Sequence, residues 1–215
     1  MKRHTVPQTL LVLLALLPAM LACNFLSRAI SPAQATQPAA RQATQALPAT
    51  AASAGSGPVR QWAAEAQASS EYGSSDWAAY QATGEPNTPE CGDIGTAWAA
   101  SSQDTKEWIN LYFKLPVFPT EIRFVETYYP DQVVQVDLID MQGQYVPVYT
   151  SRPTVVEGPC PFILTVPVKQ GSPLAQGVRI TIDQSALKNW NEIDAVEIAG
   201  MPGEGAPVRP VIPAP

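Results

Sequence analysis

EWINLYFKL, Glu107–Leu115, decides the fold of this 215-residue chain. Apolar and polar residues alternate strictly in it, so that Ile109, Leu111 and Phe113 face one side and the residues between them, Trp108 included, face the other. A period of two residues is the pattern of a β-strand with one buried face. The stretch therefore predicts a β-strand packed on an apolar core.

Similar short segments lie on both sides of this stretch, and Gly- and Pro-containing turns separate them. Near-regular spacing of short strands is typical of an antiparallel β-sandwich. Residues 133–139 and 144–149 flank a turn as in a hairpin, and Pro147 marks the returning strand as an edge strand or a bulged one. Only residues 76–82 predict a helical turn. The expected strands are 61–69, 107–115, 120–127, 133–139, 144–149, 162–168, 178–182 and 193–199.

The first residues predict export. A basic start, Met1–His4, precedes the apolar run Thr9–Ala22, which is too short for a membrane span and typical of a signal peptide. Cys23 follows a small residue directly, which resembles a bacterial lipoprotein signal, in which the cysteine is acylated and becomes the new N-terminus. Met20 and Leu21 depart from the usual pattern, and a cleaved signal with an incidental cysteine is the alternative.

The composition divides the chain into four parts. We expect a signal peptide at 1–22, a lipid-anchor cysteine with an Ala-, Pro- and Gln-rich linker at 23–57, one domain at 58–200 and a disordered Pro-rich tail at 201–215. Acylation would hold the protein stably on a membrane through its lipid alone. The predicted location is therefore the cell surface, with the domain displayed on a tether.

The charge of the domain excludes one class of partner. Residues 58–200 contain 18 acidic and 8 basic residues, a net charge of −10. Such a surface repels the phosphates of DNA, RNA and anionic lipid. It suits cations, neutral sugars or basic proteins.

The cysteines and the histidine limit the chemistry. Cys91 and Cys160 are the two cysteines left in an exported chain and most simply form a disulfide, although a free thiol nucleophile is the alternative. His4, the only histidine, lies in the signal peptide. Triads with histidine and His-bearing zinc sites are thereby excluded, and carboxylate-only catalysis is not.

Three motifs carry a resemblance to a known family. They are W-x-x-x-Q-A-x-G-x-P-x-T-P at Trp77–Pro89, CGDIGTAWA at Cys91–Ala99 and NWNEIDAVEIAG at Asn189–Gly200. With the strands between them they resemble a discoidin-type (F5/8 type C-like), galactose-binding-like jelly roll. More narrowly, they resemble the pappalysin SD scarf modules of bacterial surface proteins. The resemblance implies an all-β sandwich and a binding or adhesion role, without catalysis.

In that fold type the first and last strands pair antiparallel, which would bring Ser69–Tyr72 beside Asn189–Asp194. Several carboxylates would then meet at one rim, and their mutual repulsion favours a bound cation such as structural calcium. Solvated loop acids are the alternative, and a catalytic carboxylate pair is a further one. The predicted metal ligands are Glu71, Asp76, Asp93, Thr96, Glu192 and Asp194.

The aromatic residues divide into core and ligand candidates. Trp62, Trp98 and Trp108 are expected in the core, since aromatic side chains dominate small β-cores. Trp77 and Trp190 lie among polar loop residues, where an indole can stack on a sugar ring; packing at the end of the sandwich is the alternative. The predicted ligand-binding residues are Trp77, Trp190, Asn189, Asn191, Tyr128 and Tyr129.

Arg123 and Arg179 alternate with apolar neighbours, so we expect them to cover a sheet face and to pair with acids. The sequence as a whole predicts a non-catalytic module that binds a glycan or an extracellular protein. The alternatives are an envelope component, which would expose a flat apolar patch, and a small glycan hydrolase with a carboxylate pair in a cleft.

Overall fold

The computed structural model describes residues 57–154, 156, 158 and 160–203. The predicted signal peptide, Cys23, nearly all of the linker and residues 204–215 lie outside these ranges. Within them no helix has the length and apolar composition needed to cross a bilayer. The elements are β1 (Val59–Trp62), β2 (Glu65–Ala68), η1 (Ala79–Ala82, a 3₁₀ turn), β3 (Lys106–Tyr128), β4 (Val133–Asp140), β5 (Tyr145–Thr150), β6 (Phe162–Pro167), β7 (Ala175–Asp183) and β8 (Glu192–Pro202).

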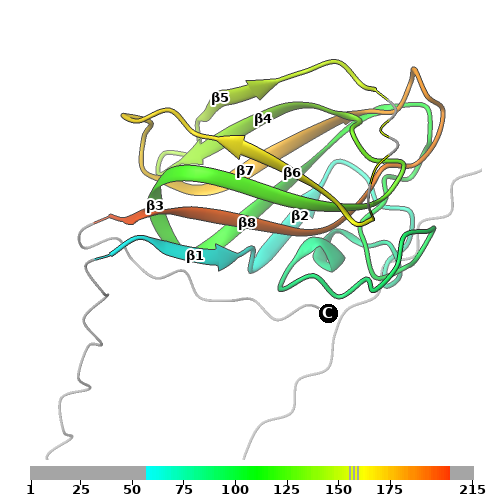
Figure 1. Ribbon diagram of the computed structural model, residues 1–215, viewed down its shortest axis with the longest axis horizontal. Helices are drawn as coiled ribbons and strands as arrows, with labels where there is room; N and C mark the ends of the chain where they lie inside the picture. Colours follow the sequence, from blue (N-terminus) through cyan, green and yellow to red (C-terminus); the bar gives the residue numbers. More distant parts are fainter. Residues whose placement is uncertain (1–56, 155, 157, 159, 204–215) are drawn as a thin grey trace, which may run out of the picture. The chain divides into compact units, whose positions relative to one another are not determined.

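The long strand β3 belongs to two sheets (Figure 1). Its first part, up to Tyr112, pairs with β2 and β7, and its second part pairs with β8 from Val117 and with β6 from Glu121. The pairing with β7 shifts register between Tyr112 and Val117, where β3 passes from one sheet to the other. One sheet thus has the order β2-β3-β7-β4-β5 and the other β1-β8-β3-β6, and all pairs are antiparallel. The expected antiparallel sandwich is confirmed.

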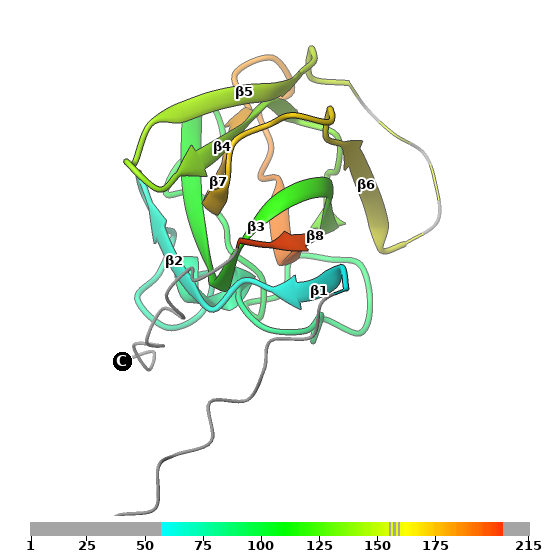
Figure 2. The same cartoon turned by 90° about the vertical axis from the view of Figure 1, so that its left-hand side faces the viewer.

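The core fills the space that the two sheets enclose (Figure 2). Ile109, Leu111 and Phe113 of β3 point into it, as their alternation predicts, and Trp98 is fully buried beside them. Burying an aromatic or branched aliphatic side chain stabilises the fold by roughly 1.5–3 kcal/mol each. The apolar residues of β7 and β8 close the core from the two sides.

Two strand predictions differ from the structure. Residues 61–69 form two strands, because the chain changes sheets between them: Ala63 donates its N–H to Val196 of β8, and Ala64 donates to Tyr112 of β3. Residues 107–115 and 120–127 form one strand, because β3 continues through Pro116 and Pro119 with new partners.

Other expectations are confirmed. β4 and β5 form the hairpin, β5 is an edge strand, and Pro147 lies beside a register shift in it. The first and last strands pair antiparallel, Val59 opposite Gly200. β8 continues through Pro202, two residues beyond the expected end of the domain.

Trp108 is not in the core. It lies on the outer face of β3, where the guanidinium of Arg179 stacks 4.1 Å from its ring centre and 3.9 Å from that of Tyr145. Arg179 donates its hydrogen bonds to Asn110 and Tyr145. The prediction that Arg179 pairs with an acid is therefore wrong. Arg123 does pair with an acid, since its Nη1 lies 3.1 Å from Glu197. Trp62 is only partly buried.

Candidate functional site

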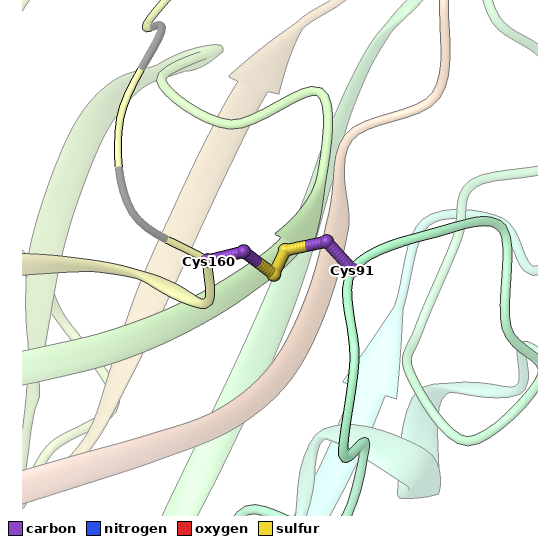
Figure 3. Close-up of a disulfide and its surroundings, with 2 residues drawn as sticks. All are labelled: Cys91 and Cys160. Carbon is purple, nitrogen blue, oxygen red and sulfur yellow. A yellow bond between two sulfur atoms is a disulfide. The ribbon is translucent and has the colours of Figure 1, made fainter.

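The predicted disulfide forms between Cys91 and Cys160, whose Cα atoms are 5.7 Å apart. It joins the loop that follows η1 to the residues just before β6 (Figure 3). Both cysteines lie at the end of the sandwich where β8 begins. We call this end, with residues 69–77, 86–101, 128–131 and 184–191, the loop end.

Three aromatic rings gather at the loop end. Tyr72 packs edge-to-face on Trp77, with ring centres 5.4 Å apart and planes at 77°, and on Trp190 at 5.6 Å and 82°. Tyr72 is 55% exposed, so the group opens to solvent. With the Asp93 and Glu192 carboxyl groups and Ala99 these rings line a hollow of about 30 Å³, which we call the aromatic cleft.

Protein contacts fix the orientation of both indoles. The Nε1 of Trp77 donates to Glu192 Oε1 at 3.2 Å, and the Nε1 of Trp190 donates to the carbonyl of Ala100 at 3.1 Å. Trp77 also has a backbone φ of +55°, a value that side-chain-bearing residues rarely adopt. Such strain persists only where the surroundings enforce it, and it often marks functional sites.

A pair of carboxyl groups forms the base of the aromatic cleft. Glu192 is 1% exposed, and burial raises its pKa to about 8. The N–H groups of Ile94 and Trp77 oppose this rise, while a hydrogen bond and the charge of Asp93 add to it. Near neutral pH Glu192 therefore retains its proton.

A second and larger hollow lies beside the disulfide. It has a volume of about 370 Å³, and we call it the tyrosine pocket. Tyr128 and Tyr129 pack edge-to-face in it with ring centres 4.8 Å apart, and Tyr129 is 42% exposed, so one of the two tyrosines is exposed as expected. Its lining also includes Cys91, Thr127, Pro130, Cys160, Phe162 and Leu187.

The tyrosine pocket and the carboxyl pair lie near each other at the loop end. Tyr128 lies opposite Glu192 in the pairing of β3 with β8. Burial raises the pKa of the Tyr128 hydroxyl, and the nearby Tyr129, Asp93 and Glu192 raise it further. Tyr128 therefore links the tyrosine pocket to the strand position that carries Glu192.

Asp194 holds part of the loop end in place through its hydrogen bonds. Its Oδ1 accepts hydrogen bonds from the Thr88 hydroxyl at 2.8 Å and from the N–H groups of Thr88 and Asn87 at 3.2 and 3.3 Å. The Thr88 hydroxyl also lies 2.7 Å from that of Thr96. Asp194 and Thr96 thus hold residues 87–96 against β8.

The five carboxylates predicted at one rim do not form a single cluster. Glu71 accepts the backbone N–H of Ala79 at the start of η1, and Asp76 packs against Gly95. Among the described residues, no three acidic, histidine or cysteine side chains converge as a metal site requires. That gathering is therefore a wrong expectation, and only Asp93 and Glu192 remain in direct contact.

The two asparagines predicted as ligand contacts have local partners. The side chain of Asn189 accepts the N–H of Trp190 at 3.0 Å. Asn191 is fully buried and donates its Nδ2 to Glu126 Oε1 at 2.6 Å and to the carbonyl of Tyr129 at 3.2 Å. Asn191 therefore supports the backbone of Tyr129 from within the core.

The sequence analysis missed two residues of this region. Tyr72 was named only as the end of a strand, and nothing in its local pattern distinguishes it. Glu126 is fully buried. A signal for Glu126 existed, because it continues the inward alternation of Ile122 and Phe124.

The comparisons with known proteins agree with this fold. The model of the family described as pappalysin-1, SD scarf domain, C-terminal, matches residues 51–208. The chain belongs to this family. No curated protein matches the SD scarf chain.

Solved structures resemble the SD scarf domain in fold. Two are structures of chitosan-binding module 1 from a chitosanase/glucanase of Paenibacillus sp. IK-5, one of them a selenomethionine-labelled mutant. The mutant is 18% identical with a TM-score of 0.50 and covers 63% of this chain and 93% of its own. The unlabelled module is 16% identical with a TM-score of 0.50 over 63% and 94%.

An F5/8 type C domain from Bacteroides fragilis is 16% identical with a TM-score of 0.47 and covers 66% of this chain and 97% of its own. At these identities the chitosan-binding modules establish likeness of fold only. The expected β-sandwich fold and the SD scarf family are confirmed.

Proposed function

We propose that the loop end of this SD scarf domain binds a glycan outside the cell and performs no covalent chemistry on it. One observation carries the proposal. Trp77, Trp190, Tyr128 and Tyr129, chosen from the sequence as ligand candidates, line two hollows at the loop end.

The chemistry of the two hollows suits a sugar. About 370 Å³ is within the range of small-ligand sites, roughly 300–1,000 Å³, so the tyrosine pocket has room for a sugar ring. Ring faces can pack on the apolar face of the sugar, and carboxylate oxygens accept hydrogen bonds from its hydroxyl groups. The likeness to a chitosan-binding module supports a glycan ligand through the shared fold.

The geometry disfavours a hydrolase. Asp93 and Glu192 hydrogen-bond to each other, whereas glycosidase carboxyl pairs stand about 5–9.5 Å apart to flank the scissile bond. Their cleft of about 30 Å³ does not admit a sugar ring between them. A binding role does not require the two carboxyl groups to stand apart or a sugar ring to fit between them.

The proposed setting of the module rests on the sequence of residues 1–57. The predicted signal peptide and Cys23 support export and a lipid anchor at the cell surface, with the linker as a tether. Calcium stays a predicted structural cofactor. Asp93 and Glu192 are the carboxyl groups left to hold it, and two carboxyls make a weaker site than five.

Binding of the purified protein to a glycan array, followed by titration of the best glycan, tests the proposal. We expect Tyr129→Ala and Trp190→Ala each to weaken binding at least about tenfold, since buried aromatic contacts dominate recognition. Phe118→Ala is the matched control, because Phe118 is equally exposed but lies at the opposite end of β8.

If both site variants bind the glycan with unchanged affinity and unfold at the same temperature as the wild type, the loop end is not the binding site. A protein that binds no glycan but associates through Phe118 and Met201, which are exposed and paired, would favour the envelope component.

A further inference from the structure

We propose that the aromatic cleft of Tyr72, Trp77 and Trp190 receives a protonated amine, the ammonium group of an amino sugar. The inference rests on the proposed glycan binding and adds the chemical class of the glycan. It follows from the size, the walls and the charge of the cleft.

Size selects a small group. A hollow needs roughly 10–15 Å³ to hold one water molecule, so about 30 Å³ admits one or two groups of that size. An ammonium group has the size of a water molecule, and a sugar ring is several times larger. The cleft therefore fits a substituent of a sugar and not the sugar itself.

Three aromatic side chains line the cleft. Tyr72 stands nearly perpendicular to both indoles. Cations bind to the faces of such rings, best to tryptophan, and this interaction contributes roughly 0.5–2 kcal/mol. The indole N–H groups, which would repel a cation, already donate to Glu192 and to the carbonyl of Ala100.

The base of the cleft is negative and has no cation of its own. Within the described residues every ion pair joins Arg60 or Arg123 to Glu121 or Glu197. Neither Asp93 nor Glu192 takes part in one. A ligand cation above these carboxyls would therefore supply their missing counter-charge, and its N–H groups would find acceptors there.

The proposed glycan binding makes a sugar the expected source of the amine. An amino sugar carries the amine directly on its ring, so the ring itself would lie at the mouth of the cleft, which is too small to hold it. A lysine places its ammonium at the end of a thin flexible stem, and a lysine peptide is therefore included in the test.

The test is isothermal titration of the purified protein in EDTA, which removes divalent cations as competitors. The ligands are a trimer of glucosamine, the matched trimer of N-acetylglucosamine and a lysine tripeptide. A solution near pH 6.5 keeps the amine charged, since amino groups of this type titrate at about 7.7. We expect the glucosamine trimer to bind at least about tenfold more tightly than its acetylated counterpart, a difference of about 1.4 kcal/mol.

Two variants locate the effect. Asp93→Asn removes an exposed charge with little change of shape, and Tyr72→Ala removes the exposed wall; each should erase most of the preference for the free amine. Glu85→Gln is the matched control, because it neutralises an exposed acid in another part of the surface, and it should leave the preference unchanged.

Equal affinity for the two trimers would overturn the inference and leave glycan binding in place. Selective binding of the lysine tripeptide, lost in Asp93→Asn, would also overturn it, because the cleft would then serve a protein partner. If none of the three ligands binds in the titration while neutral glycans bind on the array, the amine inference is refuted. The proposed glycan binding then still stands.

Discussion

Glu126 has the most unusual surroundings of any ionisable side chain described. It points into the core at the loop end, and its Oε1 accepts hydrogen bonds from Asn191 and from the backbone N–H of Asp131. Its Oε2 is buried without a protein partner among the described residues. Burial raises the pKa of Glu126 to about 7, against the opposing effect of its two donors.

This pKa predicts a pH-dependent stability. Folded Glu126 holds its proton more tightly than the unfolded chain does, so its contribution is fully present below pH 4.5 and is lost as the pH rises to about 7. A shift of this size corresponds to about 3 kcal/mol. We expect urea unfolding to show the wild-type protein losing stability over this range, and Glu126→Gln losing about 3 kcal/mol less.

Glu85→Gln is the control, since Glu85 is exposed. If Glu126→Gln and the wild type lose stability in parallel between these pH values, another group is responsible. The raised pKa of Glu192 adds a decline of the same sign that continues toward pH 8, and it is present in both proteins.

At the scale of single residues, the alternation of apolar and polar residues predicted the core side chains better than the surface ones. The strict alternation of Glu107–Leu115 placed Ile109, Leu111 and Phe113 correctly. It also placed Trp108 on the outer face, and the rule that tryptophans belong in the core overrode it wrongly. Partners such as Arg179 and Tyr145 for Trp108 depend on β5 and β7, and no local pattern specifies them.

At the scale of elements, β8 is held unusually close to β3. A Cβ placed on Gly200 would collide with the carbonyl of Phe118 and lie 2.9 Å from the Cα of Pro119. Backbone atoms cannot move aside as a flexible side chain can. Gly200 is therefore required where the end of β8 crosses the bent part of β3.

We expect Gly200→Ala to destabilise the domain by about 1–3 kcal/mol, as overpacking of a tight contact does. Thermal unfolding measures this as a drop of several degrees for a domain of this size, at about 2–4 °C per kcal/mol. Gly57→Ala, at a glycine with open space around it, should unfold like the wild type. An unchanged midpoint in Gly200→Ala would show that the strands separate freely there.

The elements show what the sequence could and could not predict. The β4–β5 hairpin was predictable because a turn joins two local segments. The continuity of β3 and the division between β1 and β2 were not, because each depends on which distant strand supplies the hydrogen bonds. The position of Tyr72 was unpredictable for the same reason. It depends on the hydrogen bond from the N–H of Tyr72 to the carbonyl of Ala99, a distant residue, which brings Tyr72 beside both indoles.

For the molecule as a whole, the Cys91–Cys160 disulfide closes a loop of 69 residues. On the chain-entropy model this stabilises the fold by about 4 kcal/mol. We expect Cys91→Ser with Cys160→Ser to lower the free energy of unfolding by about this amount in urea. Because both cysteines line the tyrosine pocket, glycan affinity should fall as well.

A reducing agent should reproduce both effects in the wild type and cause no further change in the double variant. Full stability after reduction would mean that contacts around the disulfide, and not the covalent bond, hold residues 91 and 160 together.

The architecture was predictable from the resemblance, whereas the arrangement of acids was not. Motifs identified the family, and the pairing of the first and last strands followed. Glu71 and Asp194 do not join the carboxyl pair, because Glu71 accepts the backbone N–H of Ala79 and Asp194 accepts the hydroxyl of Thr88.

The pairing of Val59 with Gly200 also determines how the domain would respond to mechanical force. Residue 57 leaves the sandwich near the last residues of β8, while the loop end lies at the first, eight residues or roughly 25 Å away. Tension between a tether at residue 57 and a ligand at the loop end acts along β1. It loads the hydrogen bonds between β1 and β8 in shear, all at once, and does not peel them apart one by one. If a tether holds residue 57, a ligand bound at the loop end would therefore load the strand pairing that resists pulling best.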